Sequence, residues 1–469
     1  MPAPWPLEPG SEELEAHTRM VADFVLAQLR GLAEAPSFDL EGIEPLRASF
    51  TQDHPPEQPT PLATLLERLK PAIAKSYNTA GPGYLAYIPG GGVYAAALAD
   101  FVACATNRYV GVTQAAPALA QIEETTTGWL CRLMGLPPEA RGILTSGGSL
   151  SSFAAVVTAR HERLGEAFQD GVLYFSEETH YCVPKAARLA GFPRASLRVL
   201  PTDARYRLQP AALAEAIRED RARGLRPFMV VANVGTTNTG AIDPLPEVLE
   251  LARGHDLWVH ADAAYGGFFR LARGAEARLA GIEACDSITL DPHKGLFLPY
   301  GLGALLVRDG QALARVHREG AGYVQDVTRE GSLGFADLSP ELSRDFRGLR
   351  LWLPLMLHGL GAFREQLEEK LALATWAYRE LASDEHFELL DEPQLSVVAF
   401  RLRAPAPEAD RLGPQLLRRV NDKKRVFLSS TRLRGRYALR LCVLSFRTHA
   451  KRVEDAVVAL RQEARALLG

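Results

Sequence analysis

Lys294 is the residue of this chain best placed for covalent chemistry. The chain has eight lysines among 53 basic residues, and Lys294 is the one lysine between Lys185 and Lys370. It lies just after the apolar segment 287–290. A lysine amine can lose its proton and act as a nucleophile, whereas a guanidinium does not. Because desolvation lowers the pKa of a lysine, we expect Lys294 to be a Schiff-base-forming amine with a lowered pKa.

Asp262 is the second candidate, because it follows another apolar segment, 257–260. A carboxylate is costly to bury without a positive partner. A protonated pyridine nitrogen would be such a partner, and the carboxylate would keep the ring cationic. The alternative is an aspartate that caps the next turn. Together with Lys294, Asp262 favours a pyridine cofactor.

The segment 145–149 contains Gly147, Gly148 and Ser149 and joins an expected strand to an expected helix. Glycines let the backbone approach an anion, and free amides at a helix start bind phosphate. The segment lacks the spacing of a nucleoside-triphosphate loop, and an ordinary turn with a serine cap is the alternative. Thr237 could add a hydroxyl to the same region, unless it only shapes a turn.

Two histidines are further candidates, because His180 follows the expected strand 172–175 and His293 directly precedes Lys294. His180 could stack on a planar heteroaromatic ring and hydrogen-bond a substrate carboxylate, and His293 could hydrogen-bond a phosphate. A lone histidine is more often structural, so neither residue decides the function.

Short apolar segments alternate with helical patterns between about residues 140 and 310. This alternation predicts an α/β fold with a mostly parallel sheet that is covered on both faces. Ligands of such sheets collect at the carboxyl ends of the strands, where the candidate residues fall. The expected strands are 142–144, 172–175, 228–232, 257–260 and 287–290, and the expected helices are 149–164, 181–190 and 244–253.

Outside this region the chain divides into further parts. We expect an N-terminal helical arm and linker at 1–75, a large α/β domain at 76–345 and a small α+β domain at 346–469. The arm combines a helical pattern at 12–34 with a Pro-rich stretch at 53–61, and we expect it to pack on a partner subunit. Further helices are expected at 114–136 and 341–382, and further strands at 395–402 and 437–444.

Composition excludes several classes of function. The 469-residue chain has a net charge of −3, so it has no basic field for nucleic acid. Its five cysteines show no metal-binding spacing, which indicates reduced thiols and no metal site. We find neither a secretory signal nor an apolar run long enough to cross a membrane. We therefore expect a cytoplasmic protein without nucleic-acid or membrane partners.

Taken together, these motifs resemble those of the group II pyridoxal-phosphate-dependent decarboxylases, which include aromatic-L-amino-acid, glutamate and histidine decarboxylases. Asp-Pro-His-Lys at 291–294 is similar to the family's Schiff-base motif, and 260–265 resembles its Asp-x-Ala motif. The segments 145–149 and 179–180 resemble its phosphate loop and stacking histidine. The likeness extends from about residue 70 to the C-terminus and includes the segments 342–352 and 425–432.

The resemblance implies a fold type I enzyme with a seven-stranded-type sheet, working as a homodimer with a shared active site. Lys294 would hold pyridoxal 5'-phosphate as an internal aldimine, Asp262 would pair with the pyridinium nitrogen, and Ala264 would lie under the ring opposite His180. Gly148, Ser149, Thr237 and His293 would help to hold the phosphate. The cofactor site would also include Gly147 and Asp291, and Asp291 stands where the family often has asparagine or another small polar residue.

The resemblance also implies decarboxylation of an L-amino acid to its amine and CO₂. The segment 83–91 is similar to the family's substrate-lining segment, which suggests Tyr87, Pro89 and Gly90 as substrate residues. Gly90 stands where threonine is usual in the aromatic enzymes. Tyr87 and Ile88, with Tyr109 from a partner, would line an apolar pocket suited to an aromatic or large aliphatic side chain.

The family's mobile loop contributes a tyrosine that protonates the carbanion, and that position falls nearest Phe335. A phenylalanine cannot donate a proton, and Tyr323 is the other candidate donor. Within the family, phenylalanine at this position is associated with oxidative deamination to an aldehyde, ammonia and peroxide. The further alternatives are transamination, for which a carboxylate-binding arginine motif is lacking, and a catalytically silent homologue. The presence of Lys294, Asp262 and His180 argues against the silent homologue.

Overall fold

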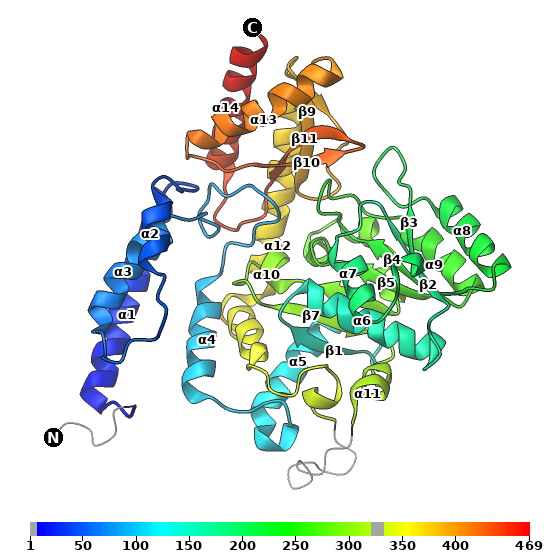
Figure 1. The fold of residues 1–469 in the computed structure, drawn as a ribbon, viewed down its shortest axis with the longest axis horizontal. Coiled ribbons are helices and arrows are strands. Elements are labelled where there is room, and N and C mark those ends of the chain that lie inside the picture. Colours follow the sequence, from blue (N-terminus) through cyan, green and yellow to red (C-terminus); the bar gives the residue numbers. More distant parts are fainter. Residues whose placement is uncertain (1–6, 320–332) are drawn as a thin grey trace.

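The computed structural model describes residues 7–319 and 333–469. Within these residues the chain forms a seven-stranded sheet, a four-stranded sheet and an N-terminal group of helices (Figure 1). Tyr323 lies outside the described residues.

The seven-stranded sheet has the order β1-β7-β6-β5-β4-β2-β3. β7 is antiparallel to both of its neighbours, and the remaining strands run in one direction, as the mostly parallel prediction requires. The five expected strands correspond to β1, β2, β4, β5 and β6. The strands are β1 (Arg141–Thr145), β2 (Gly171–Ser176), β3 (Leu197–Leu200), β4 (Arg226–Asn233), β5 (Trp258–Asp262), β6 (Ser287–Leu290) and β7 (Gly303–Val307).

Two strands of this sheet were not predicted. β3 is an edge strand with partly exposed residues, so it has no continuous apolar run. β7 is fully buried but reverses the direction of the chain, so the alternation of strand and helix does not indicate it.

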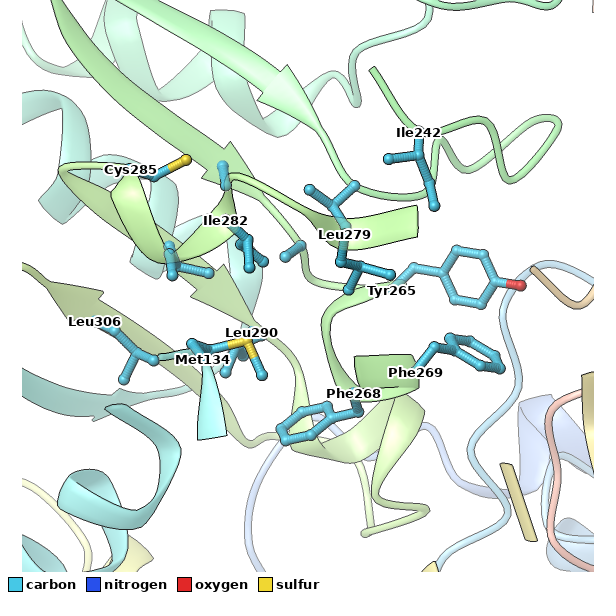
Figure 2. Close-up of a cluster of buried hydrophobic side chains, with 14 of the residues drawn as sticks. Met134, Ile242, Tyr265, Phe268, Phe269, Leu279, Ile282, Cys285, Leu290 and Leu306 are labelled. Atoms are coloured by element: carbon cyan, nitrogen blue, oxygen red, sulfur yellow. The ribbon is translucent and has the colours of Figure 1, made fainter. Parts of the chain in front are cut away.

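Both faces of the sheet are buried, because neighbouring residues of one strand enter different hydrophobic clusters. In β4, Val230 belongs to one cluster and Val231 to the other. Figure 2 shows the first cluster, where Tyr265, Phe268 and Phe269 project from the segment after β5. This packing makes the strands rigid supports for the residues at their ends.

Helices surround the sheet, and those expected at 149–164, 181–190 and 244–253 correspond closely to α6, α7 and α9. The helices from residue 94 to 317 are α4 (Tyr94–Thr106), α5 (Pro117–Leu133), α6 (Gly148–Leu164), α7 (Cys182–Leu189), α8 (Pro210–Ala222), α9 (Leu245–Gly254), α10 (Pro292–Gly295) and α11 (Gln311–His317). Short 3-10 helices are η1 (Thr113–Ala115), η2 (Arg194–Ser196), η3 (Gly267–Leu271), η4 (Glu276–Leu279), η5 (Ile282–Ala284) and η7 (Phe335–Asp337).

The C-terminal part contains the four-stranded antiparallel sheet, in the order β10-β11-β9-β8. It has its own hydrophobic cluster, to which the long helix α12 contributes. The elements are α12 (Arg347–Ala382), β8 (Phe387–Leu389), β9 (Val397–Leu402), α13 (Ala406–Asp422), β10 (Ser429–Leu433), β11 (Arg436–Cys442) and α14 (Ala450–Leu468). The boundaries of the three predicted parts stay predictions.

The N-terminal helices are α1 (Ser11–Gly31), α2 (Ile43–Ser49) and α3 (Leu62–Ala74). None of them contains a buried residue, and Figure 1 shows them at one side of the molecule. The Pro-rich stretch at 53–61 forms neither helix nor strand, as predicted. Among the described helices, none is long and apolar enough to span a membrane.

Candidate active site

A cavity of about 250 Å³ opens at the carboxyl ends of the parallel strands. Every residue that the sequence suggested for cofactor binding lines it, although these residues come from separate strand ends. They are Gly147, Gly148, Ser149, His180, Thr237, Asp262, Ala264, Asp291, His293 and Lys294. The parallel sheet brings them together because its strands end at one edge.

Lys294 lies on the short helix α10, directly after β6. Its Nζ is 2.9 Å from Oδ2 of Asp291, and 23% of its side chain is exposed. Burial opposes the charge of the amine, but the carboxylates of Asp291 and Asp262 outweigh it and raise the pKa of Lys294. The predicted lowering of this pKa is therefore wrong. The reason is that the sequence argument included burial but not the neighbouring carboxylates.

Asp262 ends β5 and is buried in the floor of the cavity. Its Oδ1 accepts a hydrogen bond from the backbone N–H of Ala264, at 3.3 Å, so the residue does shape the next turn. Burial raises the pKa of Asp262, although Lys294 and His180 oppose the shift. A buried carboxylate with this environment is suited to a cationic partner in the cavity, such as a protonated pyridine ring.

His180 follows β2 and borders the cavity with its imidazole ring. Its Nδ1 accepts a hydrogen bond from the backbone N–H of Cys182, at 3.3 Å. Burial lowers the pKa of His180, which favours the neutral ring with its proton on Nε2. This tautomer leaves Nε2–H free to donate to a ligand.

His293 has the opposite tautomer. Its Nδ1 donates to the carbonyl oxygen of Leu302, at 2.7 Å, and burial lowers its pKa. In this neutral ring Nε2 carries no proton, so donation to a phosphate requires the ring to take up a second proton. The predicted contact of His293 with the phosphate stays a prediction.

The glycines of the 145–149 segment allow a close approach to the cavity wall. A Cβ at Gly148 would lie 3.1 Å from Oδ2 of Asp291, and Gly147 has a φ of 150°. Helix α6 begins at Gly148. The amides of Leu150 and Ser151 donate to the carbonyl of Gly147, at 3.0 and 3.2 Å, whereas those of Gly148 and Ser149 have no partner within the helix. These amides can hold a phosphate group.

The comparisons with known proteins identify the family of this chain. The sequence model of the pyridoxal-dependent decarboxylase conserved domain matches residues 45–403. An aromatic-L-amino-acid decarboxylase of Bacillus atrophaeus is 32% identical over 461 residues, which cover 97% of this chain and 96% of the relative. This chain belongs to the pyridoxal-dependent decarboxylase family.

Other relatives support the same assignment. Tryptophan decarboxylase 2 of Oryza sativa subsp. japonica is 29% identical, covering 99% of this chain and 97% of the relative. The crystal structure of Oryza sativa TDC with PLP and tryptamine superposes with a TM-score of 0.94 at 26% identity and covers all of both chains. The protein is thus a decarboxylase, a carboxy-lyase that uses pyridoxal 5'-phosphate.

The residues present fit this cofactor. Asp262 would place a buried carboxylate at the pyridine nitrogen, Lys294 would offer an amine to the aldehyde, and the start of α6 would offer amides to the phosphate. The family assignment and the geometry of the cavity therefore agree.

Further residues of the decarboxylase cavity were not singled out from the sequence. They are Cys182 and Asn233, whereas Ser146, Gly235, Thr236 and Tyr265 belong to the segments 145–149, 235–237 and 260–265 that the sequence had already suggested. Asn233 ends β4, and its Nδ2 donates to Oδ2 of Asp243 at 2.8 Å and to the hydroxyl of Thr179 at 3.1 Å. Its place directly after the predicted strand 228–232 was a signal that could have identified it.

The predicted substrate residues do not line this cavity within one chain. Tyr87 is 54% exposed, whereas Pro89 and Gly90 are buried. The hydroxyl of Tyr109 donates to the carbonyl of Leu342, at 3.0 Å. Their roles toward a substrate stay predictions.

Gly90 has a structural requirement that the sequence did not reveal. A Cβ at this position would lie 1.9 Å from the carbonyl oxygen of His293. The residue is therefore the point where the segment 83–91 packs directly on the turn that carries Lys294. A threonine side chain does not fit at this position of the backbone, so the close packing explains why the residue is a glycine.

Phe335 lies in η7, is 6% exposed and lines a different cavity of about 540 Å³. The Arg344 guanidinium lies over its ring, 5.1 Å from the centroid, and Arg344 pairs with the buried carboxylate of Glu123 at 2.5 Å. Within its own chain Phe335 is thus separate from the cofactor cavity. A role of Phe335 in catalysis stays a prediction.

Proposed function

We propose that this decarboxylase converts an aromatic L-amino acid to the corresponding amine and CO₂. The observation that carries the proposal is the shared cavity of Lys294, Asp262 and His180 in a chain that is 32% identical to an aromatic-L-amino-acid decarboxylase. A second supporting comparison is Catharanthus roseus tryptophan decarboxylase, solved in complex with L-tryptophan, with a TM-score of 0.90 at 26% identity.

Bound pyridoxal phosphate supplies an electron sink for the electron pair that remains when CO₂ departs. Asp262 would keep the pyridine nitrogen protonated, because a buried carboxylate and a neighbouring cation stabilise each other's charge. His180 donates its Nε2–H to the substrate carboxylate and orients it. The Lys294 amine must lose its proton before it can act as a nucleophile, and Asp291 opposes that loss.

The functional unit of this proposal is a homodimer. The N-terminal helices bury no residue in the single chain but expose Leu65, Leu69 and Ile73 on α3. Helix α4 exposes Leu98, Phe101 and Val102. Such apolar helix faces are suited to a second copy of the chain. The five cysteines are all free, which supports a reducing, cytoplasmic location.

Sedimentation velocity tests the dimer with Leu69→Glu, which places a charge on the exposed face of α3. We expect this variant to be monomeric and inactive, with the control Val458→Glu on α14 remaining dimeric. A monomeric wild-type enzyme with full activity would contradict the dimer.

A panel of all standard amino acids tests the substrate. CO₂, amine and peroxide are measured together on the holoenzyme. We expect CO₂ and amine in equal amounts from at least one aromatic amino acid. CO₂ release from acidic amino acids alone would refute the proposed substrate class.

A second candidate is decarboxylation coupled to oxidative deamination, which yields an aldehyde, ammonia and peroxide. It is favoured by Phe335, which has no proton to donate at the position expected for the donor tyrosine. A phenylacetaldehyde synthase of Arabidopsis thaliana is also 26% identical, covering 98% of this chain. Peroxide formed in proportion to CO₂ distinguishes this candidate from simple decarboxylation.

A further inference from the structure

Arg440 is a buried arginine of the C-terminal sheet that reaches the wall of the cofactor cavity. It lies on β11, and only 2% of the residue is exposed. Among the described residues, no carboxylate forms an ion pair with its guanidinium. All of its hydrogen bonds instead go to main-chain carbonyls and one hydroxyl.

These acceptors belong to three segments that are far apart in the sequence. Nε donates to the carbonyl of Asn238 at 2.8 Å, and Nη2 donates to the carbonyl of Thr237. Nη2 also donates to the carbonyl of Tyr87 at 3.2 Å, and Nη1 donates to Oγ of Ser429 at 3.0 Å. One planar group therefore joins the cavity wall, the segment 83–91 and the C-terminal sheet.

The contact with Tyr87 supports an unfavourable backbone conformation. Tyr87 has a φ of 52°, in the left-handed region that residues with a side chain rarely adopt. Its carbonyl accepts from Arg440, and its N–H donates to Oγ of Ser429 at 3.0 Å. Arg440 and Ser429 thus hold both backbone polar groups of Tyr87, which offsets the conformational cost.

The contact with Thr237 and Asn238 reaches the cofactor side. Thr237 lines the cavity, and the side-chain amide of Asn238 donates to Glu178, at 2.9 Å, two residues before His180. The Asn238 side chain also accepts from the hydroxyl of Thr431, at 2.8 Å. The position of the loop at 237–238 therefore depends on the C-terminal sheet.

Stability alone does not account for this arrangement. Burial lowers the pKa of Arg440, which shows that its charge is poorly solvated. Removing a guanidinium from water is costly, and apolar side chains usually stabilise a core as well or better. We propose that Arg440 is a positioning residue that holds Thr237 and Tyr87 in a fixed relation, and thereby sets the binding of cofactor and substrate.

The chain offers a matched control in Arg401. It lies on β9 and is 6% exposed. Arg440 pairs with Ala399 of the same strand, and Arg401 lies two residues further along, so both arginines lie on one face of the sheet. Its Nη2 donates to the carbonyl of Leu433 at 3.2 Å, within the same sheet. Arg401 therefore reproduces the burial of an arginine without contact to the cavity.

The test compares Arg440→Gln, Arg440→Lys and Arg401→Gln in the holoenzyme. The loss of bound pyridoxal phosphate on dilution is followed by absorbance, and Tm, KM and kcat are measured for the amino acid that the wild type decarboxylates. We expect Arg440→Gln to release cofactor and to raise KM roughly tenfold, since hydrogen bonds from a charged donor are lost. We expect Arg440→Lys to recover part of this effect and Arg401→Gln to change Tm alone.

If Arg440→Gln does not fold, Ser429→Ala supplies the test, because it removes the hydroxyl shared by Arg440 and Tyr87. We expect it to raise KM about threefold with little change in cofactor release. Wild-type cofactor release and KM in a folded Arg440→Gln variant, or a wild-type KM in Ser429→Ala, would overturn the proposal. The KM measurement relies on the proposed conversion of an aromatic amino acid to its amine, whereas cofactor release needs no substrate, so the two hypotheses fail separately.

Discussion

Oδ2 of Asp291 lies 2.9 Å from Nζ of Lys294, across a single turn of the chain. The amine that must become a nucleophile is thus paired with a carboxylate that keeps it protonated. The raised pKa of Lys294 means that the fraction of free amine is small at neutral pH and increases as the pH rises.

Asp291→Asn is expected to speed the capture of pyridoxal phosphate by the cofactor-free enzyme near neutral pH. Without the carboxylate the pKa of Lys294 falls, and each unit of that fall increases the free amine about tenfold at a pH below both values. The rate of capture is measured by absorbance across a pH series. The control Asp309→Asn changes an exposed ion pair with Arg315. An unchanged pH profile in Asp291→Asn would show that Asp291 does not control the amine.

Lys294→Ala is expected to lower kcat at least about a thousandfold, because no other residue of the cavity supplies an amine. The fold should persist, since the side chain is partly exposed and its truncation leaves no closed void. CO₂ release and thermal unfolding are the measurements. Sustained turnover in this variant would refute the assignment of the lysine.

Gly90→Ala is expected to destabilise the enzyme by roughly 2 kcal/mol and to weaken cofactor retention, because its Cβ would collide with the carbonyl of His293. Gly361→Ala is the control, since a Cβ there meets no atom within 4 Å. Thermal unfolding and cofactor absorbance measure the two effects. Equal behaviour of both variants would mean that the segment at Gly90 can move away without consequence.

Phe335→Tyr is expected to raise the ratio of amine to aldehyde by restoring a proton donor. Phe335 lines a cavity of about 540 Å³, and the substitution adds a single oxygen atom, so we expect the variant to fold. Amine, aldehyde and peroxide are measured in the same reaction. If all three products keep their wild-type proportions, the residue type at position 335 does not decide the fate of the carbanion.

Much of the site was predictable because it follows the strand ends. Asp262, His180 and Lys294 each come directly after an apolar strand or its loop, and parallel strands end at one edge of the sheet. Residue type and local order were sufficient for these residues. The cofactor was therefore predictable before any distance was known.

The sequence by itself determined the α/β fold, the cofactor and most of the residues that line the candidate cavity, since strand periodicity and local motifs specify them. Only the tertiary structure showed that Asp291 raises the pKa of Lys294, that Gly90 packs on His293 and that Arg440 bridges Thr237 and Tyr87. Except for the first, these contacts join segments that are far apart in the chain. No local spacing encodes such contacts, and the sign of a pKa shift depends on the distances between charges, which the folded chain alone sets.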